Sequence, residues 1–344
     1  MTRFGLYGSG WRAEFFIRVA RSLPHLFSIA GMITRDPEKA ARFIRLGLHV
    51  YPAAEELLAT GHIDFMVVSV NASVSVDISL DLLRQGVPVL LETPVAPSIP
   101  DLARFKQSLP AGAKLQIAEQ YPLQPMHQAR LAMIAQGKLG TPSFVQISNT
   151  HAFHAIALMR KYLGIGLTET VTKVTATSFP ISGVAGFMRD GLSPTERIDT
   201  PTQVIATMQF DNGKVGLINH EGGQHRSYVR SSIVQVKGER GEILNSQLKY
   251  LKDHRTPITS TFEHKLLGQE DNFEGYDLKG IFVDSQWIYT NPYTGSRLVD
   301  DEIAVAQLMK HMAEYVAGGA CYYGIEEAGR DVALWAEVEA ALQS

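Results

Sequence analysis

The sequence predicts two domains, an α/β fold followed by an α+β fold. The first is a doubly wound parallel sheet over residues 1–121, and the second, over residues 122–344, has a large open, mainly antiparallel sheet with helices on one face. Three observations predict this: apolar segments alternate with helical patterns in the first third, a glycine-rich turn follows the first apolar segment, and β-rich segments dominate the remainder. A chain of 344 residues also exceeds one ordinary core.

The elements of the first domain alternate regularly. The strand "RFGLYG" ends in glycine, and in the following "WRAEFFIRVARSL" the residues Phe15, Val19 and Leu23 share one helical face. After a second strand, "FSIAGMIT", Asp36 is placed to cap a helix that has Pro37 at its first position. Further apolar strands, "DFMVVSV", "VPVLLE" and "AKLQIAE", lie between helical segments, which is typical of a parallel sheet covered on both faces.

The first turn has the spacing of a dinucleotide-binding site. Gly8, Gly10 and Ala13 form G-x-G-x-x-A between a strand and a helix, the context that separates this motif from a plain glycine turn. Gly8 permits the tight turn, Gly10 lets a pyrophosphate approach, and the helix N-terminus offers unpaired N–H groups. We expect a Rossmann domain in which Trp11 shields the pyrophosphate or anchors its helix, and which binds a nicotinamide dinucleotide at Gly8, Ser9, Gly10 and Arg12.

The end of the second strand bears on the choice between NAD and NADP. An acidic residue there would bind the ribose 2′-hydroxyl, but this strand ends in Thr34 followed by Arg35, which tolerate a 2′-phosphate. We therefore expect NAD(P) as cofactor, with a preference for NADP.

Ligands bind at the carboxyl ends of such strands, although polar residues there can also simply pair with the backbone. At these ends we expect cofactor contacts from Ser69, Asn71, Glu92, Thr93 and Gln120.

The second domain combines helices with many strands. "MHQARLAMIAQGKLG" and "HAFHAIALMRKYLG" are amphipathic helices, and Asn212-Gly213 marks a hairpin turn between two of the strands. Residues 182–199 are glycine-rich and predict a mobile loop, and two amphipathic helices close the chain. Because an open apolar sheet face invites association, we expect a homodimer or homotetramer.

These segments resemble the Gfo/Idh/MocA superfamily, named after glucose-fructose oxidoreductase, inositol dehydrogenase and rhizopine catabolism. The resemblance extends over nearly the whole chain and rests on "GLYGSGWRA", "GVPVLLETP" where the family has G-K-H-V-L-C-E-K-P, "AEQY" where it has A-E-N-Y, "MRKYLG" and "IEEAGRDVALWAEVEAAL". It implies a reaction in which a histidine takes a hydroxyl proton as hydride passes to nicotinamide, with a lysine and an aspartate beside the reacting carbon. It also implies that Asn71 contacts the nicotinamide half of the cofactor.

Two of those three catalytic positions have changed in this chain. The family histidine falls on His154, but the lysine position holds Thr93 and the aspartate position holds Thr150. Threonine can hydrogen-bond a hydroxyl, yet it carries no positive charge and does not titrate near neutral pH. The acid–base role therefore rests on His154, and Arg160 or Lys161 on the same helix supplies a substitute cation or belongs to a solvated face.

Three interpretations of the histidines remain open. In the first, they cap or pack against hydrogen-bond partners, which best suits His225, His254 and His264. In the second, His151 or His154 accepts the proton, because imidazole titrates near neutral pH. In the third, a metal is bound by His151, His154, His220 and Glu221, although their spacing fits no established zinc signature, so we expect no metal. The expected substrate contacts are Tyr121, Thr150, His151, His154 and His220.

Composition excludes several classes of partner. With 32 Lys+Arg against 35 Asp+Glu, a net charge of −3 and no basic block, nucleic acid is not expected as a partner. No apolar run is long enough for a membrane span, and no signal peptide is recognised at the start. Cys321 is the only cysteine and is expected to pack as a small hydrophobic residue, so no internal disulfide forms and a cytoplasmic location is expected.

The leading hypothesis is an NAD(P)-dependent oxidoreductase that acts on a secondary alcohol of a sugar, cyclitol or glycoside. One alternative is a redox-assisted lyase or glycosidase that retains its nucleotide. The other is a nucleotide-binding sensor or accessory protein without turnover. Exchange of the cofactor distinguishes them, because a dehydrogenase releases its nucleotide in each cycle.

Overall fold

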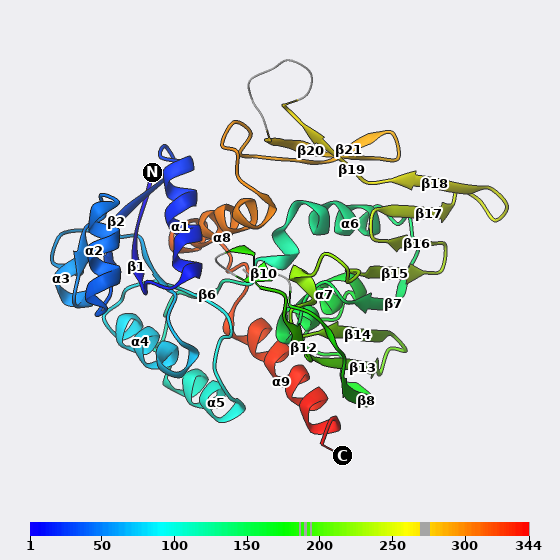
Figure 1. Ribbon diagram of the computed structural model, residues 1–344, viewed down its shortest axis with the longest axis horizontal. Helices are drawn as coiled ribbons and strands as arrows, with labels where there is room; N and C mark the ends of the chain where they lie inside the picture. Colours follow the sequence, from blue (N-terminus) through cyan, green and yellow to red (C-terminus); the bar gives the residue numbers. More distant parts are fainter. Residues whose placement is uncertain (186, 189–190, 193–194, 269–275, 344) are drawn as a thin grey trace. The chain divides into compact units, whose positions relative to one another are not determined.

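Figure 1 shows the computed structural model, in which residues 1–185, 187–188, 191–192, 195–268 and 276–343 are described. The chain divides into two compact units. The first comprises Met1–Pro125, Lys265–Gly280 and Thr290–Val332, and the second comprises Met126–His264, Ile281–Tyr289 and Ala333–Ser344. The stretch Thr290–Val332 thus groups with the first unit, although the sequence predicted it in the second domain.

A parallel six-stranded sheet forms the centre of the first unit. The strand order is β3-β2-β1-β4-β5-β6, which confirms the predicted doubly wound fold. The strands are β1 (Thr2–Tyr7), β2 (Phe27–Ile33), β3 (Val50–Tyr51), β4 (Phe65–Val68), β5 (Val89–Leu91) and β6 (Leu115–Ile117). The strands β4, β5 and β6 are buried along their whole length, as expected of strands with both faces covered. The order reverses between β1 and β4, where ligands bind in such folds.

Five helices connect these strands, and side chains fix where three of them begin. They are α1 (Trp11–Ser22), α2 (Pro37–Arg45), α3 (Ala54–Leu58), α4 (Ala72–Arg84) and α5 (Ile99–Ser108). Asp36 caps α2 by accepting hydrogen bonds from two backbone N–H groups of its first turn, as predicted. Asn71 and Ser98 cap α4 and α5, and each accepts from one backbone N–H group of the first turn.

The helix α8 (Asp300–Val316) belongs to the first unit because its apolar side is buried there beside α1 (Figure 1). Ile303, Leu308 and Met312 on α8 are fully buried. The side chain of Gln116 in β6 donates to the Leu308 carbonyl at 3.1 Å, and Arg18 of α1 pairs with Glu302. Segments distant in the sequence are therefore joined in one core. The order of the elements along the chain does not predict this grouping.

The second unit is built on an eight-stranded sheet of order β18-β17-β16-β15-β7-β14-β13-β8. All neighbours pair antiparallel except β7 and β14, so the predicted mainly antiparallel sheet is confirmed. Its strands are β7 (Pro142–Ile147), β8 (Val171–Pro180), β13 (Thr202–Phe210), β14 (Val215–Glu221), β15 (Val234–Gly238), β16 (Gly241–Leu244), β17 (Gln247–Leu251) and β18 (Pro257–Thr261). The predicted hairpin lies between β13 and β14, where Gly213 has a φ of 79°.

Two helices of this unit are α6 (Pro125–Ala135) and α7 (Ala152–Leu163). The helix α7 lies close to the sheet, because a Cβ atom on Gly216 of β14 would stand 2.2 Å from the sulfur of Met159. Nine residues of α7 are buried, including His154 and Arg160. This helix therefore fixes the position of His154 relative to the end of the adjoining strands.

The remaining elements are short, apart from the last helix. They are η1 (Tyr121–Leu123), β9 (Gly183–Val184), β10 (Phe187–Met188), β11 (Gly191–Leu192), β12 (Ile198–Asp199), η2 (Gln224–Arg226), β19 (Glu263–Leu266), β20 (Leu278–Val283), β21 (Gln286–Thr290) and α9 (Ile325–Ala341). In the segment predicted as a mobile loop, residues 186, 189–190 and 193–194 lie outside the described residues. The part of this segment that is described contains the paired strands β9 with β12 and β10 with β11. Within the described part of the chain, no helix is long and apolar enough to cross a membrane.

Candidate functional site

The two glycines of the turn after β1 have different surroundings. Gly8 has a φ of 123°, and a Cβ atom there would lie 1.9 Å from the carbonyl oxygen of Ser69 at the end of β4. Only glycine fits this close approach of two parallel strand ends. A Cβ on Gly10, by contrast, would meet nothing within 4 Å. The space next to Gly10 at the N-terminus of α1 is therefore open to a ligand, as a phosphate-binding turn requires.

A cleft of about 660 Å³ lies at this turn, at the carboxyl ends of β1, β2 and β4. Its walls include nine of the residues predicted to bind the cofactor: Gly8, Ser9, Gly10, Trp11, Arg12, Thr34, Arg35, Ser69 and Asn71. Three others predicted for the cofactor, Glu92, Thr93 and Gln120, are not among its lining residues. The volume suits a cofactor-sized ligand.

Sequence reasoning missed one wall of this cleft. It is formed by Val74, Asp77, Ile78 and Asp81, which lie on one face of α4. Their spacing of three, four and seven residues is the helical signal that could have identified this wall once Asn71 was recognised as a helix cap. Lys39 of α2 also lines the cleft and was not predicted.

The end of β2 carries the features that separate the two dinucleotides. The Thr34 hydroxyl hydrogen-bonds the Ser9 hydroxyl at 2.8 Å, so a neutral residue occupies the position where an acidic one would bind a ribose. Asp36, two residues after Thr34, is engaged in capping α2, and the backbone hydrogen bond from Lys39 lowers its pKa. Arg35 is exposed and has no ion-pair partner among the described residues.

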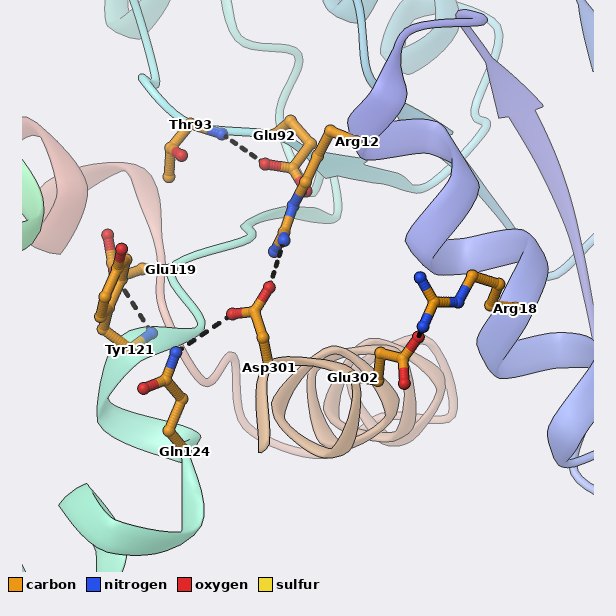
Figure 2. Close-up of polar contacts among 9 residues, drawn as sticks. All are labelled: Arg12, Arg18, Glu92, Thr93, Glu119, Tyr121, Gln124, Asp301 and Glu302. Carbon is orange, nitrogen blue, oxygen red and sulfur yellow. Dashed lines mark hydrogen bonds and ion pairs between the residues drawn. The ribbon is translucent and has the colours of Figure 1, made fainter. Parts of the chain in front are cut away.

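Arg12 is the centre of a partly buried polar network at the ends of β5 and β6, which Figure 2 shows together with neighbouring contacts. Its Nε donates to Glu92 at 2.9 Å, and another guanidinium nitrogen donates to Asp301 of α8 at 2.6 Å. When the Gln120 amide is oriented to donate to the Ala118 carbonyl, its oxygen accepts from Arg12 at 3.3 Å. Burial acts to lower the pKa of Arg12, but the two carboxylates outweigh it and the pKa is raised. The guanidinium therefore has three protein partners.

Thr93 lies at one end of this network. Its backbone N–H donates to Glu92 at 3.3 Å, so the carboxylate that holds Arg12 also holds the backbone of Thr93 (Figure 2). On the α8 side, Gln124 donates to Asp301 at 3.1 Å. The backbone N–H of Tyr121, a predicted substrate contact, donates to Glu119 at 3.2 Å. Sequence reasoning did not identify Asp301, because its partner Arg12 is 289 positions away. It did not identify Glu119 either, whose partner is the backbone N–H of Tyr121 in the same turn.

In the second unit, four histidines gather at the carboxyl ends of β7 and β14. These two strands form the parallel pair of the sheet, with Ile147 beside Ile218, so the residues after both strands arrive at one edge. The ring of His151 lies 5.6 Å from that of His154, 5.8 Å from that of His220 and 6.1 Å from that of His225. The rings of His220 and His225 are 6.2 Å apart. We call these four residues the histidine cluster.

The structure thus brings together His151, His154, His220 and His225 of η2. His154 and His220 are buried, whereas His151 and His225 are exposed. Burial lowers the pKa of His151, as do the nearby histidines, to about 4. Burial also lowers the pKa of His220. These two imidazoles are therefore uncharged at neutral pH.

Buried polar atoms beside the cluster lack hydrogen-bond partners among the described residues. They include the hydroxyl oxygen of Thr150, the Nε2 atom of His220 and one carboxylate oxygen of Glu221. The other oxygen of Glu221 accepts from Arg230 at 3.2 Å. Unpaired buried polar groups are rare in folded proteins, so each one calls for an explanation.

Burial and contacts describe other residues singled out from the sequence. Arg160 does not belong to a solvated helix face, because it is buried and donates to the Gly166 carbonyl at 3.1 Å; Lys161 is exposed. Cys321 is half-buried, with its sulfur 3.6 Å from the Leu115 carbonyl. Trp11 is 45% exposed and packs edge-on against Phe15 at 5.0 Å, which accords with anchoring of its helix.

No group of three or more His, Cys, Asp or Glu side chains within the described ranges is placed to hold a metal ion.

Residues 2–117, which contain the glycine turn and its cleft, match the model of the Gfo/Idh/MocA oxidoreductases, a family with an NAD-binding Rossmann fold. The likeness to this family is thus shown for the first domain. Among curated proteins no sequence match is found.

Solved structures with the same fold extend the similarity over the whole chain. An oxidoreductase from Agrobacterium radiobacter in complex with NAD+, L-tartaric acid and magnesium is 16% identical and has a TM-score of 0.70, with 100% of this chain and 96% of that chain covered. The UDP-N-acetylglucosamine 3-dehydrogenase of Acidithiobacillus ferrooxidans is 15% identical with a TM-score of 0.64, covering 99% and 98%. A biliverdin reductase from Synechocystis in complex with biliverdin and NADP+ is 16% identical with a TM-score of 0.65, covering 100% and 99%. At such identities the likeness establishes the fold.

Proposed function

We propose that this protein, whose first domain matches the Gfo/Idh/MocA oxidoreductases, is an NAD(P)-dependent oxidoreductase that acts on a secondary alcohol of a sugar, cyclitol or glycoside. The observation that carries the proposal is the open space at Gly10, at the N-terminus of α1, within the cleft of about 660 Å³. When bound, the nicotinamide dinucleotide supplies the hydride acceptor or donor. The cleft fits such a ligand for two reasons. The start of α1 offers backbone N–H groups to a pyrophosphate, and the space beside Gly10 is empty, so the pyrophosphate can approach the backbone.

Residues of the chain supply proton transfer and orientation. The family resemblance gives His154 the role of acid–base group, because imidazole exchanges a proton near neutral pH. Thr93 and Thr150 take the positions of the family lysine and aspartate, and each can hydrogen-bond the reacting hydroxyl or a neighbour of it. His151, His220 and Tyr121 are proposed as further substrate contacts.

We propose NADP as the preferred cofactor. Thr34 is neutral, Asp36 is engaged as a cap, and Arg35 is a cation without an ion-pair partner among the described residues at the end of β2. Lys39 on the first turn of α2 adds a second positive charge to the same cleft. Lys39 is already 3.5 Å from Asp36, so a 2′-phosphate would meet Arg35 as the cation without such a partner among the described residues. The carboxylates Asp77 and Asp81, which also line the cleft, are paired with Arg104 and Arg84.

The threonines favour a second candidate function. A neutral Thr93 stabilises an alkoxide less than a lysine would, so net alcohol oxidation would be slower. A redox-assisted lyase or glycosidase that keeps its nucleotide bound needs only transient oxidation. A nucleotide-binding sensor needs no turnover.

The proposal extends to the partners of the protein. We propose a small polyol or sugar as substrate, no nucleic acid, and a homodimer or homotetramer in the cytoplasm. The exposed side chains of β8 support association, because most of its ten residues face outward and include Phe179 at 42% exposure. Analytical ultracentrifugation at micromolar concentration tests the oligomer, and a single monomeric species would refute it.

The main test is nucleotide binding followed by turnover. Protein purified without added cofactor is denatured and the supernatant analysed for nucleotide, and the four species NAD+, NADH, NADP+ and NADPH are titrated calorimetrically. We expect binding of NADP(H) at least as tight as that of NAD(H). Nucleotide that co-purifies and does not exchange during turnover would favour the lyase or glycosidase.

A further inference from the structure

The cleft at the glycine turn has two walls of opposite charge. On the side of β2 and α2 it is lined by the cations Arg35 and Lys39. On the side of α4 it is lined by Asp77 and Asp81, which lie one helical turn apart. Because carboxylates repel phosphate, the anionic parts of a dinucleotide belong at the glycine turn and the cationic wall. The wall formed by α4 is left for an uncharged part of the ligand.

This α4 wall also has an apolar surface. Val74, which is 45% exposed, and Ile78 lie on the same face of α4 as the two carboxylates and line the same cleft. A flat ring that covers these aliphatic side chains removes apolar area from water, and a polar group at its edge can reach a carboxylate. The wall therefore suits an aromatic ring with a hydrogen-bond donor at its edge.

Of the two carboxylates, Asp77 is the better placed to accept from such a ring. A guanidinium nitrogen of Arg104 on α5 donates to Oδ1 of Asp77 at 2.6 Å and so orients the carboxylate. A carboxylate accepts through both oxygens, so Oδ2 stays available while Arg104 holds Oδ1. Since α4 begins shortly after β4 ends, Asp77 also lies one turn nearer than Asp81 to the carboxyl edge of the sheet, where the glycine turn lies.

The parts of a nicotinamide dinucleotide differ in what they offer to this wall. The ribose whose 2′ group we assign to the end of β2 carries adenine, whereas nicotinamide lies beyond the pyrophosphate. One cleft is lined by both the end of β2 and α4, so a ring attached to that ribose has α4 as its opposite wall. Adenine has apolar faces and an exocyclic amine that donates hydrogen bonds. It therefore matches both the aliphatic side chains and the carboxylate.

We propose that Asp77 accepts a hydrogen bond from the exocyclic amine of adenine, while Val74 and Ile78 pack against the ring. This inference rests on the proposed function and adds a specificity-determining contact to it. In the analogue in which hypoxanthine replaces adenine, a carbonyl oxygen takes the place of the amine. Two acceptors would then face each other, so the protein should discriminate against the analogue.

The test compares dinucleotides that differ only in this base. NADP+, NAD+ and their hypoxanthine counterparts, with and without the 2′-phosphate, are titrated calorimetrically into the wild-type protein. We expect each hypoxanthine analogue to bind roughly tenfold more weakly than its adenine counterpart, in line with the loss of one hydrogen bond to a charged group. Equal affinities of the adenine and hypoxanthine forms would overturn the proposal.

The variant Asp77→Asn tests the assigned residue. Its side-chain amide can either accept from an amine or donate to a carbonyl, so the ratio of the two affinities should fall to within about twofold. The ratio is the readout, because loss of a negative charge strengthens the binding of every anionic nucleotide. Glu55→Gln, on the exposed side of α3, removes the same charge outside the cleft and should leave the ratio as in the wild type. A wild-type ratio in a folded Asp77→Asn protein, checked by thermal melting, would overturn the assignment.

Failure of this inference is distinguishable from failure of the proposed function. If a polyol is oxidised with NADP+ but the hypoxanthine analogue binds equally well, the contact of Asp77 is wrong and the oxidoreductase stands. If the protein discriminates between the bases through Asp77 without any hydride transfer, adenine recognition stands and the oxidoreductase fails.

Discussion

Arg12 and Glu92 form an ion pair of 2.9 Å that joins the start of α1 to the end of β5, one residue before Thr93. The carboxylate also accepts from the Thr93 backbone at 3.3 Å, and Arg12 reaches Asp301 on α8. The family motif has lysine where this chain has Thr93, yet the preceding residue, Glu92, holds a partly buried cation, Arg12 of α1. The pair therefore connects the glycine turn with the end of β5, next to Thr93, which we propose as a contact of the reacting hydroxyl.

Removing the guanidinium should destabilise the first unit. Arg12→Gln leaves Glu92 buried without its cationic partner, and loss of one member of a buried pair typically costs about 3 kcal/mol. Urea unfolding followed by circular dichroism measures the change. Arg104→Gln, which breaks an exposed ion pair with Asp77, is the control and should have little effect. Equal stabilities of the two variants would show that the buried pair is not important for the fold.

The two glycines of the turn should respond differently to substitution. Gly8→Ala places a Cβ 1.9 Å from the Ser69 carbonyl oxygen at a positive φ, so it should lower the melting temperature as well as nucleotide affinity. Gly10→Val adds its side chain to open space, so the fold should persist while nucleotide affinity falls by about tenfold or more. Calorimetry and melting curves on the same samples separate the effects. Unchanged affinity in a folded Gly10→Val protein would place the cofactor elsewhere.

Cofactor preference should depend on the end of β2. Arg35→Glu replaces a cation of the cleft with an anion that repels a 2′-phosphate, and Thr34→Asp supplies a ribose acceptor. We expect either change to shift the ratio of the dissociation constants for NADP and NAD by roughly tenfold toward NAD. Arg45→Gln, at the exposed far end of α2, is the control. A wild-type protein that strongly prefers NAD would contradict the assignment.

The histidine cluster should make stability depend on pH. Because the pKa of His151 is lowered to about 4 in the folded state, the unfolded chain binds a proton between pH 6.5 and 4 that the folded chain does not. Stability is therefore full above the unfolded pKa and falls as the pH decreases through this window. Since His151 is exposed, solvent screening reduces the expected loss to about 1 kcal/mol. Urea unfolding at pH 7 and pH 4.5 should show a smaller difference for His151→Asn than for His254→Asn. A steeper or equal difference would argue against a depressed pKa of His151.

The first domain could be predicted from its sequence because its signals are local. Gly8, Gly10 and the cap Asp36 act within a few residues of where they stand, and apolar runs identify the parallel strands. Arg12 was recognised as part of the turn, but its partners Glu92 and Asp301 are 80 and 289 positions away. No local pattern encodes such pairings. For the same reason the grouping of α8 with the first unit was missed.

The histidine cluster shows the same division between local and distant information. His151 and His154 lie at the start of one helix, so their proximity follows from the sequence. His225 joins them only because β7 and β14 pair in parallel and η2 follows β14. Sequence reasoning favoured a packing role for His225, and its ring stacks on that of His220 at 6.2 Å. The roles of the site residues stay predictions, which the variants above test.

The account is tested most directly by the formation of reduced nicotinamide from NADP+ when neutral polyols are added to wild-type protein and to His154→Ala. We expect the absorbance of reduced nicotinamide to rise with the wild type for at least one polyol. Turnover by His154→Ala should fall by roughly a hundredfold to ten-thousandfold, the range of general acid–base catalysis, with nucleotide affinity nearly unchanged. Full activity of His154→Ala on the same polyol, or no reduction by a wild-type protein that binds NADP+, would contradict the account.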